Sequence, residues 1–255
     1  MTNSPVSLRV AQITDTHLFA DPEREMMGCV TARSLQAVLA QLQQVQPQPD
    51  VLLLTGDLSQ DETTESYEQL QSHISALGIP AYWIPGNHDR PELMDQVLAT
   101  APISTQKAIQ CGGWNLLLLT SSIAGRVEGG LSAETLDWLE QQLQASDHPT
   151  LIALHHPPLL IDSEWMDQIG LRNATDLFAI LDRNPQVKLV LFGHIHQEFI
   201  QTRNGVTYLG TPSTCVQFEP RQAQFAIGSQ KPGFRLLTLF PNGSHSTVVQ
   251  RVELE

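Results

Sequence analysis

The chain has 255 residues, of which 41% are hydrophobic, and a formal net charge of -13 at pH 7. This length and apolar content are enough to bury a large core, which excludes a disordered protein. The negative charge argues against a basic nucleic-acid groove, and no apolar run reaches the roughly 18 residues of a membrane helix, so we expect neither nucleic acid nor a membrane as a partner.

Up to residue 192 the sequence alternates apolar strands with amphipathic helices. Strands are predicted at residues 8–13, 50–55, 81–84, 115–119, 150–154 and 187–192. Helices are predicted at residues 31–46 and 62–77, in a short segment from Pro91, and at residues 132–145 and 175–181. Near-continuous apolar strands separated by helices are typical of a parallel sheet that is covered on both faces.

After residue 197 the pattern changes to that of β-hairpins. Residues 199–210 and 234–252 each place an Asn-Gly pair between two strand-like runs, which is a strong hairpin signal. We therefore expect an antiparallel C-terminal region at about residues 197–255, without helices. No linker or repeat divides the sequence, so we predict one domain over residues 1–255, with two sheets and outer helices.

Polar side chains directly follow five of the predicted strands. They are Asp15 and His17, Asp57, Asn87 to Asp89, His155 and His156, and His194 and His196. Because the carboxyl ends of the strands in an open α/β sheet line its ligand crevice, these groups should converge in space. Each of them alone could be an ordinary turn or core residue, but that interpretation does not explain why five separate strands end in this way.

Imidazoles and carboxylates without a nearby thiol suit divalent metals such as Mn, Fe, Co or Zn. These side chains are too many for one tetrahedral ion, so we expect two ions with Asp57 as the bridging ligand. The remaining ligands would be Asp15, His17 and His196 for one ion, and Asn87, His155 and His194 for the other. Two metals about 3.5–4 Å apart clamp the attacking and leaving oxygens of an in-line displacement.

The charge of such a centre suits an anionic substrate. Two divalent ions bring four positive charges, and Asp15, Asp57 and a bridging hydroxide remove three, while the histidines and Asn87 are neutral. The centre therefore stays net positive, and it can attract a phosphoryl group although the protein as a whole is acidic.

Taken together, the strand-end motifs resemble the five signature blocks of the calcineurin-like metallophosphoesterases. In this sequence they read Asp15-x-His17, Gly56-Asp57, Gly86-Asn87-His88-Asp89, His155-His156 and Gly193-His194-x-His196, in the order of that family. The second block reads GDL where many members carry further acidic residues. Residues 213–220 and 231–239 also resemble the C-terminal stretch of the bacterial class III cyclic-nucleotide phosphodiesterases.

The resemblance implies a mixed α/β fold, a four-layer αββα sandwich of two mixed β-sheets flanked by helices, with the catalytic motifs at residues 15–196. It also implies roles for the third block. Asn87 would bind a metal and contact the substrate phosphate. His88 would stabilise the phosphoryl oxygens or protonate the leaving alkoxide, and Asp89 would hold the His88 ring. The simpler interpretation of these three residues is a polar turn.

The same resemblance distinguishes between the two neighbouring histidines of the fourth block. His155 would be the metal ligand, and His156 would pack or form hydrogen bonds behind it. The ligands His17 and His196 would also lie beside the substrate.

The expected reaction is hydrolysis of a phosphodiester by a hydroxide that bridges the two metals, with conversion of 3',5'-cyclic AMP to 5'-AMP as the first choice. Fe and Mn are the expected metals, with Zn, Co and Mg as alternatives. Glycerophosphodiesters, 2',3'-cyclic nucleotides, nucleotide-sugar pyrophosphates and simple monoesters are alternative substrates. A non-catalytic metal-bound interaction module is a further alternative, which the complete set of ligand positions disfavours.

Substrate choice is expected to depend on two loops, residues 18–30 and residues 212–234. Each loop carries side chains that could either stack on a nucleotide base or pack the loop itself. They are Phe19, Met26 and Met27 in the first loop, and Phe218, Arg221 and Phe225 in the second.

The cysteines and the first residues predict the cellular location. Cys29, Cys111 and Cys215 are far apart in the sequence and odd in number, so they form neither a disulfide framework nor a CxxC metal site. Residues 1–13 lack a basic leader followed by an apolar stretch, so we expect no export signal. A reducing cytoplasm is the expected location, and no residue pattern indicates an oligomeric state.

Overall fold

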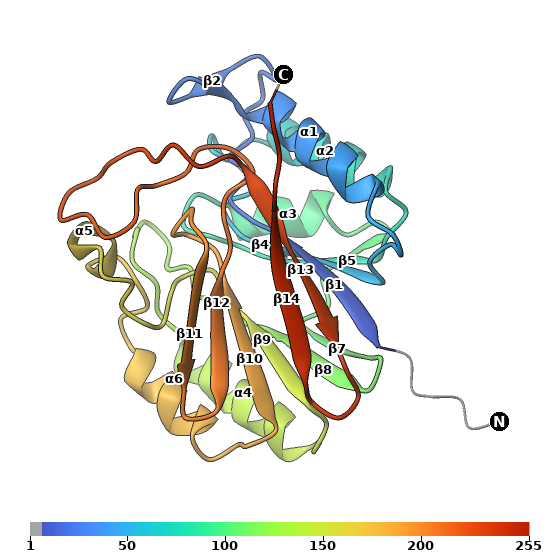
Figure 1. The fold of residues 1–255 in the computed structure, drawn as a ribbon, viewed down its shortest axis with the longest axis vertical. Helices are drawn as coiled ribbons and strands as arrows, with labels where there is room; N and C mark the ends of the chain where they lie inside the picture. The colour runs from blue at the N-terminus through green and yellow to red at the C-terminus, as the bar shows by residue number, and fades with distance from the viewer. Residues whose placement is uncertain (1–6, 255) are drawn as a thin grey trace.

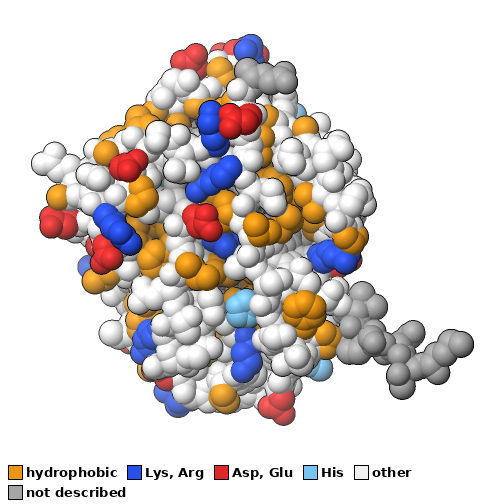
Figure 2. Space-filling view, viewed as in Figure 1, with side chains coloured by type: hydrophobic (Ala, Val, Ile, Leu, Met, Phe, Trp, Pro, Cys, Tyr) orange, Lys and Arg blue, Asp and Glu red, His pale blue; other side chains and the backbone are white. Residues whose placement is uncertain are grey.

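The computed structural model describes residues 7–254. The domain predicted over residues 1–255 and the expected lack of an export signal in residues 1–13 therefore concern, in part, residues outside the described range. Within that range, each helix is too short or not apolar enough to cross a membrane. On the face shown in Figure 2, acidic and basic side chains are interspersed.

The first large sheet has the strand order β14-β13-β1-β4-β5-β6. Its strands are β1 (Leu8–Ile13), β4 (Val51–Thr55), β5 (Ala81–Ile84), β6 (Ile103–Ser104), β13 (Gly233–Leu239) and β14 (His245–Arg251). The pairs from β1 to β6 are parallel, whereas β13 pairs antiparallel with both β1 and β14. The sheet is therefore mixed, as predicted.

The second large sheet has the order β11-β12-β10-β9-β8-β7. Its strands are β7 (Ala108–Cys111), β8 (Trp114–Leu118), β9 (Thr150–Ala153), β10 (Val187–Phe192), β11 (Phe199–Arg203) and β12 (Val206–Gly210). The expectation of a wholly antiparallel C-terminal region was wrong here, because β12 pairs parallel with β10. Residues 193–198 connect β10 to β11, which forms the edge of the sheet. β12 then returns between β11 and β10. The two C-terminal hairpins thus extend different sheets.

The helices lie close to their predicted positions. They are α1 (Thr31–Gln43), α2 (Thr64–Ser75), α3 (Pro91–Val97), α4 (Ala133–Gln144), α5 (Glu164–Asp167) and α6 (Ala174–Leu181). α1 ends at Gln43, before predicted residue 46, and Pro47 disfavours a helical conformation at Gln46. α2 begins after Thr63, whose side chain accepts a hydrogen bond from the backbone N–H of Ser66. α5 and a small hairpin of β2 (Glu25–Met26) and β3 (Cys29–Val30) were not predicted.

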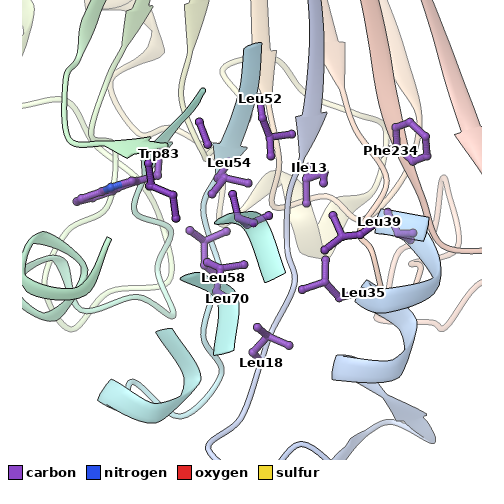
Figure 3. Packing of buried hydrophobic residues seen from close by; sticks show 14 of the residues in the cluster. Ile13, Leu18, Leu35, Leu39, Leu52, Leu54, Leu58, Leu70, Trp83 and Phe234 are labelled. Carbon is purple, nitrogen blue, oxygen red and sulfur yellow. The ribbon is translucent and has the colours of Figure 1, made fainter. Parts of the chain in front are cut away.

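Three apolar clusters separate four layers. One cluster lies between the first sheet and α1, α2 and α3 (Figure 3), one between the second sheet and α4, α5 and α6, and one between the two sheets. Successive residues of β4 alternate between clusters, since Leu52 and Leu54 face the helices and Leu53 faces the other sheet. Central strands such as β4 and β9 are buried throughout because one face of each sheet is covered by helices and the other by the second sheet. The architecture is the expected αββα sandwich (Figure 1).

Candidate metal centre

The predicted ligands lie at the carboxyl ends of central strands from both sheets. Asp15 and His17 follow β1, Asp57 follows β4 and Asn87 follows β5, all in the first sheet; His155 follows β9, and His194 and His196 follow β10, in the second. The two sheets pack face to face through a shared core, so these strand ends meet at one end of the sandwich. The structure therefore brings together all seven side chains that were predicted as ligands.

Many of these residues have a left-handed backbone. Their φ angles lie between 46° and 67° at Asp15, His17, Asp57, His194 and His196. Such a conformation costs non-glycine residues roughly 1–2 kcal/mol each and persists only where the surroundings impose it. It turns each side chain sharply inward from the end of its strand.

Gly86 and Gly193, two glycines of the motifs, allow the turns at neighbouring strand ends to pack closely together. A Cβ atom at Gly86 would overlap Oδ1 of Asp57, and a Cβ atom at Gly193 would overlap the hydroxyl of Thr14. Any larger residue at either position would displace the predicted bridging carboxylate or the strand end that carries Asp15.

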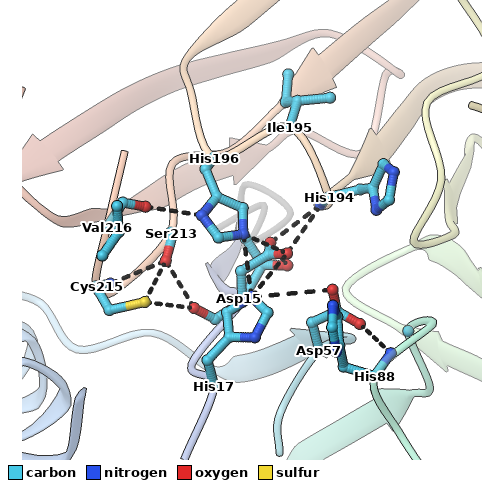
Figure 4. A network of polar contacts seen from close by, with 12 residues as sticks. Asp15, His17, Asp57, His88, His194, Ile195, His196, Ser213, Cys215 and Val216 are labelled. Atoms are coloured by element: carbon cyan, nitrogen blue, oxygen red, sulfur yellow. Dashed lines mark hydrogen bonds and ion pairs between the residues drawn. The ribbon is translucent and has the colours of Figure 1, made fainter. Parts of the chain in front are cut away.

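The first ligand cluster contains Asp15, His17 and His196, whose ligand atoms lie close enough to hold one ion. Oδ1 of Asp15 lies 3.2 Å from Nε2 of His196 and 4.0 Å from Nε2 of His17. The two imidazoles face each other, with 3.1 Å between their Nε2 atoms (Figure 4).

The hydrogen bonds behind these rings determine their tautomers. Nδ1 of His17 donates to Oε1 of Gln60 at 2.7 Å, and Nδ1 of His196 donates to the carbonyl of Val216 at 2.7 Å. In their neutral forms both rings therefore present an unprotonated Nε2. Two lone pairs that face each other beside a carboxylate repel one another unless a cation lies between them. The donor set thus fits a metal ion.

The second cluster contains His155, His194 and Asn87. Nδ1 of His155 donates to the carbonyl of Thr55 at 2.8 Å, so its Nε2 faces Nδ1 of His194 at 3.3 Å. Oδ1 of Asn87 and Nε2 of His194 are buried without a hydrogen-bond partner. A buried acceptor without a partner is costly, and binding of a cation by the Asn87 oxygen would compensate that cost.

Asp57 lies between the clusters. Its Oδ2 atom is 3.3 Å from Nε2 of His155 and 3.9 Å from Nε2 of His17. One carboxylate therefore faces imidazoles of both clusters, which is the position that a bridging ligand requires.

The charges of the cluster match those of a metal site. Burial alone would raise the pKa of Asp15 and Asp57, but the histidines that face them lower both pKa values below the ordinary range. Burial lowers the pKa of His17 to about 4 and that of His194 well below its usual value. Burial also opposes the protonation of His155, but Asp57 outweighs it and raises the pKa of His155 to about 9. A divalent cation would compete with the proton for that nitrogen.

His156 has no free ring nitrogen, although it lies close to His155 and His194. Its Nδ1 is 2.9 Å from the hydroxyl of Ser121, and its Nε2 is 3.0 Å from the carbonyl of Val127. These bonds place His156 behind His155, as the motif implied.

Residues 213–220, which were noted for their resemblance, support the first cluster from behind. The hydroxyl of Ser213 donates to the carbonyl of Asp15 at 2.7 Å, and Val216 accepts the bond from His196 (Figure 4). The ring of Phe218 stacks on that of His196, with 4.1 Å between centroids and 5° between planes. This segment holds the orientation of two predicted ligands.

Gln60 is a site residue that the sequence did not reveal. Its Oε1 accepts the bond from His17, and its Nε2 lies 3.4 Å from Nδ1 of His88. Because an amide nitrogen only donates, Nδ1 of His88 accepts, and a neutral His88 carries its proton on Nε2. The only signal was the position of Gln60, three residues after Asp57.

The role expected for Asp89 requires correction, because its carboxylate does not bind the His88 ring. It accepts hydrogen bonds from the backbone N–H groups of Leu58, Ser59 and Gly86 and from the hydroxyl of Tyr67, at 2.9–3.1 Å. Burial and the nearby Asp57 raise its pKa to about 6. Asp89 therefore connects the turn that carries Asp57 with the turn that carries Asn87.

A pocket of about 270 Å³ opens above the two ligand clusters. Its polar half includes His17, Asp57, Asn87, His88, His194 and His196, and its other half is apolar. The apolar half includes Met26, Met27, Val127, Trp165, Ile169 and Phe218.

Three of the six loop residues singled out from the sequence, namely Met26, Met27 and Phe218, thus line the pocket. Phe19 is instead a buried loop residue with Arg24 over its ring. Trp165 of α5 was not singled out.

Comparison with known proteins is consistent with this site. A family model described as calcineurin-like phosphoesterase matches residues 8–198. A protein of Nostoc sp. named 3',5'-cyclic-nucleotide phosphodiesterase is 50% identical over 251 residues, covering 98% of this chain and 94% of the relative. Proteins named 3',5'-cyclic adenosine monophosphate phosphodiesterase CpdA from Vibrio vulnificus and Escherichia coli K12 are each 42% identical, covering 98% and 96% of this chain and 92% and 90% of the relatives.

Solved structures support the fold. A dimetal phosphatase from Danio rerio superposes with a TM-score of 0.69 at 14% identity. The match covers 98% of this chain and 100% of the phosphatase chain. A purple acid phosphatase from yellow lupin seeds also has a TM-score of 0.69, at 15% identity, and covers 97% of this chain and 52% of its own.

Proposed function

The chain belongs to the calcineurin-like phosphoesterase family and is a metal-dependent phosphodiester hydrolase, and from this premise we propose that its substrate is 3',5'-cyclic AMP. The single observation that carries the proposal is the pair of ligand clusters around Asp57, which lies beneath a pocket with one polar and one apolar half. The names of the relatives from Nostoc, Vibrio and Escherichia support the cyclic nucleotide.

We assign two divalent ions to the two clusters. Asp15, His17, Asp57 and His196 would hold one ion, and Asp57, Asn87, His155 and His194 would hold the other. Imidazole, carboxylate and amide donors without thiolate suit Mn, Fe, Co and Zn alike. Among these we propose Fe or Mn, with Zn, Co or Mg as alternatives. When bound, the ions would polarise the phosphoryl oxygens and lower the pKa of water to about 7.

The side chains around the ions would position the substrate and supply a proton. Hydrolysis joins a water oxygen to phosphorus, breaks the bond between phosphorus and the 3'-oxygen, and needs a proton on that oxygen. The imidazolium form of His88 would provide this proton and regain one from solvent. Alternatively, the Nε2–H of the neutral ring, whose tautomer Gln60 supports, would stabilise the phosphoryl oxygens by a hydrogen bond. Asn87 would contact the phosphate through its amide N–H, and His17 and His196 would lie beside it. The proton lost by the attacking water would pass to solvent, and the product would be 5'-AMP.

Composition supports a small anionic substrate and a cytoplasmic location. The net charge of -13 is unsuited to a polymeric polyanion, and a pocket of about 270 Å³ suits a mononucleotide. The three cysteines are free thiols, as is usual in a reducing compartment.

A substrate panel tests the proposal. Initial rates with 3',5'-cyclic AMP, 3',5'-cyclic GMP, 2',3'-cyclic AMP, glycerophosphocholine and p-nitrophenyl phosphate give kcat/KM for each ester. We expect the highest value for 3',5'-cyclic AMP. A larger value for another ester would assign that substrate instead, and a metal-loaded protein that is inactive on all five would indicate a non-catalytic module.

Removal of the metals tests their role. We expect chelation to abolish the hydrolysis of bis(p-nitrophenyl) phosphate and the addition of Mn²⁺ or Fe²⁺ to restore it. Undiminished activity in protein shown to be metal-free would contradict the assignment.

A further inference from the structure

We propose that the apolar half of the pocket binds the base of a purine nucleotide and that Trp165 is the residue that recognises it through a hydrogen bond. The proposal rests on the proposed function, because it names the part of that site which holds the nucleoside. The phosphate and the ribose are polar and would not pack favourably against thioether, aliphatic and aromatic side chains. A flat heteroaromatic ring would pack against them.

Stacked aromatic rings connect the apolar half of the pocket to the first ligand cluster. Phe218 stacks on His196, and the Trp165 ring packs edge-to-face against Phe218, with 5.3 Å between their centroids. Phe225 packs edge-to-face against both rings, with centroids 5.2 Å from Trp165 and 5.3 Å from Phe218. These contacts hold the indole in a fixed relation to His196, so a nucleotide with its phosphate at the metals would have its base near Trp165.

Trp165 also has a polar atom without a partner. Its Nε1 is buried and donates to no acceptor in the protein. The two fully buried tryptophans differ in this respect, since Trp83 donates to the carbonyl of Leu98 at 2.9 Å and Trp114 donates to that of Phe240 at 2.8 Å. A buried donor without a partner destabilises a fold, and a phenylalanine would supply the same ring packing without this cost. The indole N–H therefore suits an acceptor on a ligand.

The two loops expected to control substrate choice both reach the apolar half of the pocket. Ser163, directly before α5, accepts a hydrogen bond from the backbone N–H of Arg221 at 2.9 Å, which joins α5 to the 212–234 loop. From the 18–30 loop, Met26 and Met27 line the same pocket, and Met27 is 54% exposed. Thioether side chains make favourable contacts with aromatic rings, so the hairpin of β2 and β3 supplies a further surface for the base.

Purines provide the acceptors that this donor needs. Adenine carries ring nitrogens with free lone pairs at N1, N3 and N7, and an indole N–H can only donate. The expected contact is a hydrogen bond from Nε1 of Trp165 to one of these nitrogens.

The test compares a nucleotide with a substrate that lacks the base. Trp165→Phe removes the N–H and keeps an aromatic ring, and Trp138→Phe on α4 is the matched control outside the pocket. Rates are measured with 3',5'-cyclic AMP and with the 3',5'-cyclic phosphate of methyl β-ribofuranoside. We expect Trp165→Phe to lower kcat/KM for cyclic AMP by about fivefold to tenfold, the scale of one hydrogen bond, and to leave the base-free substrate unchanged. Trp138→Phe should change neither value.

A second variant and a binding measurement complete the test. Met27→Ala, at an exposed position, should raise KM for cyclic AMP and not for the base-free substrate. Titration of 5'-AMP, the proposed product, into metal-loaded protein should quench indole fluorescence in the wild type and in Trp138→Phe, but not in Trp165→Phe.

The inference is overturned if Trp165→Phe matches the wild type on cyclic AMP, or if it slows both substrates equally. If the wild type fails to hydrolyse cyclic AMP, the proposed function fails, and the 5'-AMP titration alone then decides the base site. Quenching that depends on Trp165 would support the site, and quenching that persists without Trp165 would reject it.

Discussion

Oδ1 of Asp57 accepts a hydrogen bond of 2.8 Å from the backbone N–H of His88. The other oxygen of the same carboxylate faces His155 at 3.3 Å and His17 at 3.9 Å. One side chain therefore links both ligand clusters and also holds the segment that carries the proposed proton donor. Substitution of Asp57 should affect metal binding and catalysis together, whereas substitution of His88 should affect catalysis alone.

Replacing Asp57 with asparagine should remove both metal and activity. The amide has one oxygen and no charge, and its N–H group would repel a cation or meet the N–H of His88. We expect less than one ion per chain by mass spectrometry of the metals, against about two in the wild type. Asp182→Asn, at a carboxylate that binds Arg203, should retain the wild-type content. A fully metallated Asp57→Asn protein would refute the bridging role.

Replacing His88 with alanine should leave the metals in place and lower kcat by about 10²–10⁴, the usual contribution of a proton-transfer group. The ring of His88 contacts Gln60 and lies near His17, but it belongs to neither ligand cluster. Metal content and steady-state rates measure the two effects separately. His148→Ala, at an exposed position, is the control. An unchanged kcat would remove His88 from the mechanism.

Replacing Gln60 with leucine should weaken both functions moderately. The substitution removes the acceptor for His17 and the donor for His88, and loss of such a supporting partner typically costs 10–100-fold in metal affinity or activity. Gln60→Glu keeps an acceptor for His17, so its Mn²⁺ affinity should stay near the wild-type value. Equal Mn²⁺ affinities of the leucine variant and the wild type would show that His17 does not depend on Gln60.

Replacing Asp89 with alanine should destabilise the fold by about 2–4 kcal/mol at pH 7, because three backbone N–H groups lose a charged acceptor. Tyr67→Phe, which removes one further donor to the same carboxylate, should cost about 1–2 kcal/mol. Urea unfolding of chelator-treated proteins measures both changes. A variant of normal stability that nevertheless loses kcat would restore Asp89 to the role beside His88 that the motif first implied.

The sequence was sufficient to predict most of the elements and the convergence of the side chains proposed as ligands. Apolar strands alternate with helices, and parallel strands carry their C-terminal residues to one edge. Side chains such as Asp15, Asp57 and His155 were therefore expected to meet. The local chemistry of Asp, Asn and His then indicated a metal site. The inference of the fold succeeded because it depends on periodicity and residue type, which are properties of short segments.

Contacts between segments that are distant in the chain could not be predicted from the sequence. Asp89 binds the backbone of Leu58 and Ser59 rather than the neighbouring His88, because the packing of two turns decides which donors surround it. Gln60 reaches two histidines from different strands, and the apolar pocket combines Met27 with Trp165, which is 138 residues away in the chain (165 minus 27).

Residue type and spacing thus predicted the fold class and the side chains that meet at the strand ends, whereas folding alone established the supporting contacts and the shape of the pocket. The physical reason is that hydrogen-bond partners and cavity walls depend on the relative placement of whole elements. That placement follows from the packing of the two sheets and their helices against three shared cores.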